Sequence, residues 1–420
     1  MNFIDLFSGC GGLSLGLMEA GWTGLFAVEK SPDAFATLSC NLMGKFGLSF
    51  LWPKWLPFAH IDIGTLLERH ASDLRKLQGK VDLIAGGPPC QGFSYAGRRN
   101  PNDPRNKLSE EYLKVVSLVK PRLLMLENVQ GFARGFRESG KSIRRTTPQA
   151  DMVADALQSL GYRTFRDIIT SSEVGVPQPR KRFVMIAVAK DDVAFSFLGE
   201  SSPFDLFHSR VSLFRQKKGL PRSGDITAQM AIGDLELEGK ETIPCLDSDV
   251  PGFMQLAYLP PEEKNAYLAL MRRGLGDEPP NSLRIARHGV RVKERFRKIL
   301  TTCQGGKSLS PFDKERLGLK KFATTLMSGG QLAPTITTLP DDVIHYSEPR
   351  ILTVREMARL QSFPDWFSFK GCYTTGSCHR KEKCPRYTQV GNAVPPLLSE
   401  AMGQVLLAMA RGGESAGNSA

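Results

Sequence analysis

Cys90 is the residue whose type and setting best suit covalent chemistry in this 420-residue chain. It lies in the stretch Gly-Gly-Pro-Pro-Cys-Gln-Gly-Phe-Ser, residues 86–94, directly after the apolar run 81–85. That run is typical of a buried strand, and the glycines and prolines end it abruptly. A cysteine at the carboxyl end of a strand lies where open α/β sheets bind their ligands. The alternative is a small core residue, the usual fate of a free cysteine, but the neighbouring residues suit a pocket wall better.

A second ionisable group, Glu127, ends another apolar run, 123–126. The carboxyl ends of parallel strands meet at one edge of a sheet, so we expect Glu127 at the same edge as Cys90. A carboxyl group that is partly removed from water has a raised pKa and could hold a proton near neutral pH.

Arg180 and Arg182, which follow Gln178, run straight into the apolar strand 183–188. Cations at the start of a buried strand are costly unless they have anionic partners. We therefore expect this segment to orient a carboxylate, a phosphate or a base oxygen rather than to cover the surface.

The first elements are typical of a nucleotide-binding βαβ unit. Residues 2–7 form an apolar strand, residues 8–12 a glycine-rich turn, and helical spacing begins at Leu13. The turn departs from the dinucleotide fingerprint, because Ser14 stands where a third glycine would fall. A second strand, 24–28, ends in Glu29, which is placed to accept hydrogen bonds from ribose hydroxyls.

The stretch His-Ile-Asp-Ile, residues 60–63, is typical of a third strand end. It offers the carboxylate of Asp62 beside the apolar side chain of Ile63, as a purine ring needs. An acidic residue in a surface loop is an equally good interpretation of this spacing.

Composition limits the class of protein. A share of 41% hydrophobic and 23% charged residues is ordinary for a globular chain. The formal net charge of +12 favours a polyanionic partner, above all nucleic acid. Because no signal-peptide pattern and no apolar run of membrane-spanning length occur, we expect a cytoplasmic protein. Its eight cysteines are then thiols, a nucleophile or metal ligands rather than disulfides.

Four residues near the end of the chain could bind zinc. They are Cys372, Cys378, His379 and Cys384. Their spacing lacks a Cys-x-x-Cys pair, so unpaired thiols in a basic loop are the favoured interpretation and we expect no metal.

Helices are expected where caps and apolar spacing coincide. Ser31 caps one that has proline at its first position, and Thr353 with Glu356 forms a capping box. Two others are expected at 148–160 and 396–410. Residues 200–335 lack steady strand alternation or long helices.

Basic residues recur at helical spacing over 284–298, with Gly289 as an interruption. They are Arg284, Arg287, Arg291, Arg295 and Lys298. Such a stretch could lie along phosphates, or it could be a solvated face. The same alternatives hold for the basic loop within 131–147.

The motifs, taken in order, resemble those of the bacterial DNA cytosine-5 methyltransferases. The matching segments are Phe-Ser-Gly-Cys-Gly-Gly-Leu (7–13), Gly-Pro-Pro-Cys-Gln-Gly-Phe-Ser (87–94), Glu-Asn-Val (127–129), Gln-Pro-Arg-Lys-Arg (178–182) and Gln-Val-Gly-Asn-Ala-Val-Pro-Pro (389–396). The resemblance implies an α/β fold, a Rossmann-like class I methyltransferase mixed sheet with a second, smaller, irregular target-recognition domain. It implies a catalytic domain at 1–195, the recognition domain and hinge at 196–384, a segment completing the catalytic domain at 385–410, and a disordered tail at 411–420.

The resemblance also implies a reaction, the transfer of a methyl group from S-adenosylmethionine to carbon-5 of a cytosine flipped out of duplex DNA. Cys90 would add to carbon-6 of the ring, since carbon-5 is too poor a nucleophile unaided. Glu127 would bind or protonate N3, and Arg182 would hold O2 with Arg180 and Gln178 in support. Base flipping costs roughly a few kcal/mol, and the loop 92–105 is the expected cover.

The expected binding residues fall into two sets. The cofactor set is Phe7, Gly9, Gly11, Glu29, Asp62, Ile63, Pro89, Leu108, Asn392, Ala393 and Val394. The DNA set is Ser94, Arg98, Arg99, Arg105, Arg291 and Arg295. The resemblance further implies the modification half of a restriction system, with a cognate endonuclease acting on the same site, and a monomer.

Two alternatives remain at this stage. RNA cytosine methylation would use identical chemistry, but the basic insert between the motifs favours duplex DNA. A catalytically silent DNA-binding regulator is disfavoured because the four residues that would carry the chemistry, Cys90, Glu127, Arg180 and Arg182, are all present.

Overall fold

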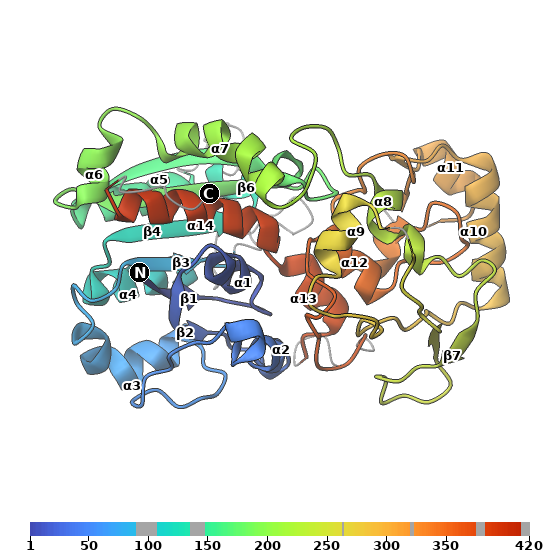
Figure 1. Cartoon of the computed structure of the whole chain (residues 1–420), viewed down its shortest axis with the longest axis horizontal. Helices are drawn as coiled ribbons and strands as arrows, with labels where there is room; N and C mark the ends of the chain where they lie inside the picture. The colour runs from blue at the N-terminus through green and yellow to red at the C-terminus, as the bar shows by residue number, and fades with distance from the viewer. Residues whose placement is uncertain (90–106, 135–147, 263, 320–322, 375–382, 413–420) are drawn as a thin grey trace, which may run out of the picture.

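The computed structural model describes residues 1–89, 107–134, 148–262, 264–319, 323–374 and 383–412. They form two lobes of unequal size, a larger one around a six-stranded sheet and a smaller one of short helices and strands (Figure 1). The expected α/β fold with a smaller irregular second domain is confirmed.

The sheet of the larger lobe is mixed. Its strands are β1 (Asn2–Leu6), β2 (Thr23–Val28), β3 (Leu83–Gly86), β4 (Leu123–Asn128), β5 (Tyr162–Thr170) and β6 (Lys181–Ala189). They lie in the order β2-β1-β3-β4-β6-β5. Strands β1 to β4 pair in parallel, whereas β6 runs antiparallel to both β4 and β5. The carboxyl ends of β1 to β4 therefore meet at one edge, which is where such sheets bind ligands.

Alternate strand residues point to opposite faces of the sheet, and helices cover both faces. On one face Phe3 and Leu83 pack with residues of α1, α2, α6, α7 and α14. On the other face Ile4 and Ile84 pack with residues of α3, α4 and α5. These helices are α1 (Gly12–Glu19), α2 (Pro32–Leu42), α3 (Ile63–Arg75), α4 (Lys107–Val119), α5 (Gln149–Ser159), α6 (Val193–Leu198), α7 (Pro203–Lys217) and α14 (Pro396–Ala410).

The first helix, α1, and the last helix, α14, pack against each other in the larger lobe (Figure 1). A Cβ added at Gly16 of α1 would lie 2.4 Å from the Pro396 carbonyl oxygen and 2.4 Å from the Ser399 Cβ. Only glycine allows the two helices to approach so closely. The last helix thus packs into the larger lobe beside the first.

The smaller lobe consists of short elements between α7 and α14. They are β7 (Thr242–Pro244), β8 (Met254–Leu256), β9 (Lys307–Ser308), β10 (Thr325–Leu326) and β11 (Val343–Ile344), with α8 (Ala228–Ile232), α9 (Ala266–Met271), α10 (Val290–Thr302), α11 (Pro311–Arg316), α12 (Val354–Leu360) and α13 (Arg386–Asn392). Arg359 of α12 is fully buried and pairs with Asp365 and Asp234. Such buried ion pairs add to the main hydrophobic core, which continues from the larger lobe into this one through Met357, Phe363 and Phe367, beside two smaller clusters.

The expected helix starts are confirmed at α2 and α12. The Ser31 hydroxyl accepts a hydrogen bond from the Ala34 N–H, and Thr353 with Glu356 forms a complete capping box. The strand expected at 60–63 is wrong, because Asp62 instead caps α3 by accepting a hydrogen bond from the Thr65 N–H.

One expectation for the region after residue 200, that it lacks long helices, is wrong. Helix α7 lies there and packs on α14 and β5, so the larger lobe extends past residue 195. The basic helix α10 begins only after Gly289, the residue expected to interrupt it. Arg284 therefore lies outside α10, stacked between the rings of Phe253 and Tyr373 at 4.0 and 3.9 Å.

One stretch of the described residues, Arg386–Ala410, has the length and apolar composition of a membrane span. It comprises α13 and α14, and 72% of its most apolar window is buried inside the protein. Its α14 part is a core helix of the larger lobe, because α14 packs on α1, α6 and α7.

The contact between α1 and α14 gives a prediction. In an exposed helix Gly→Ala stabilises by about 1 kcal/mol, but Gly16→Ala should destabilise by about 1–3 kcal/mol, because the added methyl group overlaps α14. Thermal unfolding measures the difference. Gly330→Ala is the matched control, since no atom lies within 4 Å of its added Cβ. A Gly16→Ala protein as stable as the parent would contradict the close contact.

Candidate active site

Glu127 and Arg182 form a buried ion pair between neighbouring strands. In the β4–β6 register Glu127 lies opposite Val184, two residues after Arg182. The Arg182 Nε lies 2.8 Å from the Glu127 Oε1, and the side chains are only 13% and 10% exposed. Burial raises the pKa of Glu127, while the positive charges of Arg182 and Arg180 oppose that rise. The site thus holds a carboxyl group that binds a proton more readily than an exposed one.

The turn that leads to Cys90 lies against this pair. A Cβ added at Gly87 would lie 3.2 Å from the Glu127 Oε2, so the glycine lets the backbone pass close to the carboxylate. The Asn128 amide donates a hydrogen bond of 2.8 Å to the Pro88 carbonyl oxygen. These contacts hold the turn after β3 against the carboxyl end of β4, where Glu127 lies. Cys90 itself, with Ser94, Arg98, Arg99 and Arg105, lies outside the described residues.

Gln178 and Arg180 lie just before Arg182 in the chain. Both are buried, and their polar groups bind parts of the chain beyond residue 335. The Gln178 amide nitrogen donates to the Leu360 carbonyl oxygen and the Gln361 Oε1. Arg180 donates to the carbonyl oxygens of Ile336 and Gly391, each at 2.7 Å. These contacts suit the supporting role expected of both residues, and they join the active-site strand to the smaller lobe.

The expected cofactor residues of the first turn do come together. The Glu29 carboxylate accepts hydrogen bonds from the Gly9 N–H at 2.9 Å and the Ser31 N–H at 2.7 Å. Gly9 and Gly11 have φ of +56° and +96°, and Phe7 has φ of +62°. A side chain at Gly9 would meet no atom of the described residues within 4 Å, so these residues leave open space at the turn.

The segment 392–394 lies beside the glycine turn that precedes α1. A Cβ added at Gly12 would be 2.4 Å from the Val394 carbonyl oxygen, so this segment contacts the amino end of α1 directly after the glycine turn. An open glycine turn, a carboxylate whose oxygens retain acceptor capacity, and a helix amino end suit a ligand with a ribose. Burial raises the pKa of Glu29.

Asp62, Ile63 and Leu108 are placed less directly. The Ile61 N–H donates to the Glu29 carbonyl oxygen at 2.8 Å, which brings Asp62 beside the end of β2. The Asp62 carboxylate caps α3, and these hydrogen bonds lower its pKa. Ile63 is buried in the core between the sheet and α3, and Leu108 packs against the same core. An adenine contact by Ile63 stays a prediction.

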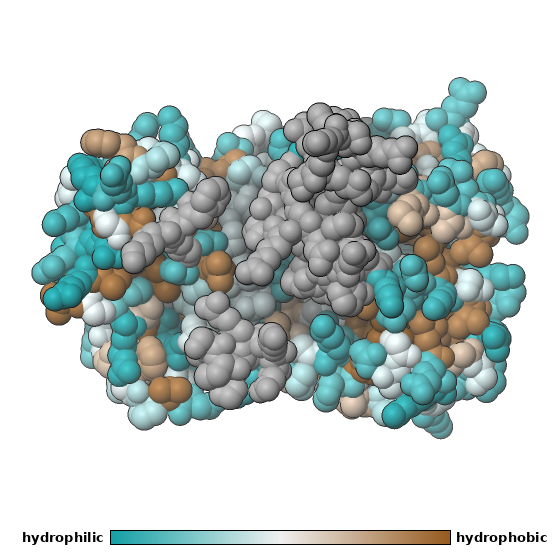
Figure 2. Space-filling view, turned by 180° about the vertical axis from the view of Figure 1, so that it is seen from behind, coloured by the Kyte–Doolittle hydropathy of each residue, from teal (hydrophilic) through white to brown (hydrophobic). Residues whose placement is uncertain are grey.

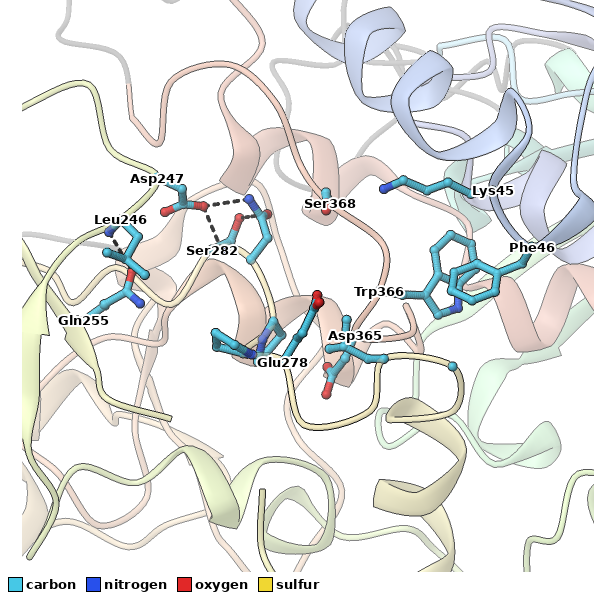
Figure 3. Close-up of a pocket in the computed structure, with 15 residues that line it drawn as sticks. Lys45, Phe46, Leu246, Asp247, Gln255, Glu278, Ser282, Asp365, Trp366 and Ser368 are labelled. Atoms are coloured by element: carbon cyan, nitrogen blue, oxygen red, sulfur yellow. Dashed lines mark hydrogen bonds between the residues drawn. The ribbon is translucent and has the colours of Figure 1, made fainter. Parts of the chain in front are cut away.

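A cavity of about 490 Å³ between the lobes is separate from these groups. Lys45, Phe46 and Trp366 line it at one end and Asp247 at the other, with Asp365 between them (Figure 3). Asp247 is already bonded to the Asn281 amide and the Ser282 N–H, as the dashed lines show. None of the expected site residues lines this cavity.

The basic helix α10 is amphipathic, as predicted. Phe296 and Ile299 are buried, while Arg291 is exposed and Arg295 half-buried. Figure 2 shows mostly hydrophilic side chains over the end of the smaller lobe that carries α10. Within the described part of the chain no group of His, Cys, Asp and Glu residues could hold a metal ion. Cys378 and His379 lie outside it.

Sequence reasoning missed three residues that shape the site. Asn128 ties β4 to the turn before Cys90, and Gln361 binds Gln178. Asp5 in the middle of β1 is fully buried, and its only hydrogen-bond partner among the described residues is the Ser14 hydroxyl. Burial raises the pKa of Asp5 to about 7. An acidic residue inside an apolar run was the available signal for Asp5, whereas Gln361 gave none.

Comparisons with known proteins were made on the whole chain. The family model of the C-5 cytosine-specific DNA methylases matches residues 1–408. The type II methyltransferase M.DdeI of Desulfomicrobium norvegicum is 30% identical over 96% of this chain and 88% of its own length. M1.HphI of Haemophilus parahaemolyticus, also a type II methyltransferase, is 31% identical over 97% and 87%.

Solved structures show the same fold. A proposed DNA modification methyltransferase of an E. coli prophage aligns with a TM-score of 0.64 at 24% identity, over 98% of this chain and 99% of that chain. The Dnmt2 methyltransferase of S. pombe aligns with a TM-score of 0.52 at 17% identity, over 97% and 98%.

The buried Asp5 gives a prediction about pH. Between its ordinary pKa of 3.8 and about 7, the folded chain holds a proton that the unfolded chain releases. The free energy of unfolding therefore falls as pH rises through this range, by up to about 1.4 kcal/mol per pH unit. Asp5→Asn should remove that slope in urea-unfolding measurements between pH 5 and pH 8. Asp155→Asn, at an exposed position of α5, should keep it, and an unchanged slope in Asp5→Asn would contradict the assignment.

Proposed function

This chain belongs to the C-5 cytosine-specific DNA methylases, and on that premise we propose which of its residues carry out the reaction. As a DNA cytosine-5 methyltransferase it uses S-adenosylmethionine as methyl donor. The observation that carries the proposal is the buried Glu127–Arg182 pair beside the turn that leads to Cys90.

Cys90 forms the covalent bond that activates the cytosine ring. As a thiolate it adds to carbon-6, and the electron pair of the 5,6 double bond becomes available at carbon-5. Glu127 hydrogen-bonds or protonates N3 and so neutralises the charge that reaches it, and Arg182 orients that carboxyl group and binds O2. Once carbon-5 carries the transferred methyl group, loss of its proton to solvent expels the Cys90 thiolate and restores the 5,6 double bond, and any proton on N3 returns to Glu127.

The cofactor site is formed by the glycine turn and its neighbours. S-adenosylmethionine, when bound, supplies an electrophilic methyl group. Glu29 binds the ribose hydroxyls, and the glycine turn gives the ligand access to the backbone. Further contacts are assigned to Phe7, Gly9, Gly11, Asp62, Ile63, Pro89, Leu108, Asn392, Ala393 and Val394. The open space at Gly9 and the position of Val394 against α1 support this assignment.

The substrate is DNA, and the proposal adds that it is duplex DNA read at a short sequence by the smaller lobe. Arg291 and Arg295 of α10 would contact phosphates, with Ser94, Arg98, Arg99 and Arg105 nearer the flipped base. The net charge of +12 supports a polyanionic partner. Because its relatives are type II methyltransferases, we further propose a cytoplasmic monomer whose cognate restriction endonuclease cuts the same sequence.

The central prediction concerns transfer of labelled methyl groups from S-adenosylmethionine to unmethylated genomic DNA, followed by base-resolution mapping. The parent protein should label carbon-5 of cytosine in one sequence context, and Cys90→Ala should label none. Glu127→Gln should slow transfer by about 10²–10⁴-fold, the usual contribution of a proton-transfer group. Cys303→Ala, which removes a half-buried thiol at the end of α10, is the control and should retain parent activity.

Three outcomes would overturn the assignment. Label in RNA but not in DNA would favour the RNA alternative, and DNA binding without transfer would favour the silent regulator. Full activity in Cys90→Ala would remove the covalent mechanism.

The basic helix gives a separate prediction. Each phosphate contact contributes about 0.9 to the slope of log affinity against log salt concentration. If Arg291 and Arg295 both contact phosphates, their joint replacement by Gln should reduce that slope by about 1.8. Fluorescence-anisotropy titrations at several salt concentrations measure it. The matched control replaces Arg69 and Arg75, two exposed arginines of α3, and an equal loss in both proteins would show a general charge effect instead.

A further inference from the structure

Two buried glutamines bind each other where the lobes meet. The Gln178 Nε2 donates to the Gln361 Oε1 at 2.9 Å, and both side chains are fully buried. Gln178 lies just before β6, and Gln361 ends α12, which the buried pair of Arg359 with Asp365 holds in place. The contact therefore joins two rigid elements from different lobes.

The Gln178 side of this contact is close to the proposed base site. Gln178 is followed by Arg180, and then by Arg182, the partner of Glu127. The Gln178 Oε1 also accepts a hydrogen bond from the Ile336 N–H at 3.0 Å, and Arg180 donates to the Ile336 carbonyl oxygen. These buried hydrogen bonds to Ile336 therefore fix the backbone of residues 178–180, which leads directly to Arg182.

The Gln361 side of this contact is close to the proposed cofactor site. The Gln361 Nε2 donates to the Val390 carbonyl oxygen at 2.8 Å and to that of Ala393 at 3.5 Å. Arg180 also reaches the Ala393 carbonyl oxygen, at 3.3 Å. The next residue, Val394, lies against Gly12 at the end of the glycine turn. One side chain, Gln361, thus binds both the strand of the base site and the segment of the cofactor site.

The chemistry of the amide group explains why a glutamine suits this position. Gln361 uses its oxygen as an acceptor toward Gln178 and its nitrogen as a donor toward residues 390 and 393. An apolar residue of similar size would leave the Gln178 amide and these carbonyl oxygens short of partners, at about 1–3 kcal/mol for each group left unpaired. Because the hydrogen bonds are directional, they also fix the distance between the two segments that they join.

We propose that Gln361 is a positioning residue that sets the cofactor segment 392–394 relative to the Glu127–Arg182 pair, so that binding at either site strengthens binding at the other. This inference rests on the proposed function, which assigns a reactant to each side. Gln361 touches neither reactant, and its effect passes through Gln178 and the backbone of residues 390–393.

Gln389 provides a matched control. It too is a buried glutamine, and it lies on α13 one residue before Val390. Its amide binds the Thr37 hydroxyl of α2 and the carbonyl oxygens of Lys370 and Cys384. Its side chain therefore connects the lobes away from β6, so replacing it tests the general cost of losing a buried amide at this junction.

The experiment measures the binding of S-adenosylhomocysteine by calorimetry, to the protein alone and to the protein saturated with a duplex that contains the mapped methylation site. The ratio of the two affinities is the coupling between the sites, typically about 5- to 150-fold. Gln361→Met should reduce this ratio to near one, and Gln389→Met should keep the parent ratio even if it lowers the unfolding temperature equally. The double variant Gln178→Met, Gln361→Met should lose no more coupling than Gln361→Met alone, because both residues act on one path.

The outcomes separate the two proposals. A parent protein that binds neither probe would remove the proposed function itself. A parent that binds both without coupling, a Gln361→Met protein with the parent ratio, or an equal loss in Gln389→Met would each overturn the role of Gln361. If Gln361→Met does not fold, Gln361→Glu keeps the acceptor for Gln178 and loses the donor to residues 390 and 393, and the same ratio decides. In steady state, loss of coupling should appear as a lower kcat and a raised KM for S-adenosylmethionine at saturating DNA.

Discussion

The site depends on keeping a carboxylate and a guanidinium group together out of water. Removing either charge from solvent alone would cost several kcal/mol, so Glu127 and Arg182 are stable in the core only as a pair with further polar support. The backbone around them supplies that support. Asn128 holds the turn beside the carboxylate, and Arg180 and Gln178 anchor the strand that carries the guanidinium group.

The need to support this buried pair explains why the last segments of the chain pack against its first elements. The two terminal nitrogens of Arg180 donate to backbone oxygens of residues 336 and 391, which the chain reaches only after it has built most of the smaller lobe. The last helix, α14, then packs on α1 with a glycine at the closest contact. The same closure brings residues 392–394 to the glycine turn, so one packing event completes both the core and the cofactor side of the site.

The smaller lobe meets a different demand. Its inner part shares the main hydrophobic core with the larger lobe, and fully buried arginines bound to carboxylates and carbonyl oxygens also fix its elements. Such directional contacts help to specify one arrangement of irregular segments. The surface that results is polar and carries the basic face of α10, which suits a substrate with a phosphate backbone.

The sequence by itself determined most strands of the sheet, the capped helices and the family, because these depend on local spacing and on side-chain type. It placed Glu127 and Arg182 correctly at strand ends, since a charged residue bordering an apolar run is visible in one dimension. It misjudged the strand expected at 60–63, and it gave no sign of the partners of Gln178 or of Gln361. Those features depend on which distant backbone group lies within 3 Å of a side chain, and only the packing of α14 and the smaller lobe against the sheet decides that.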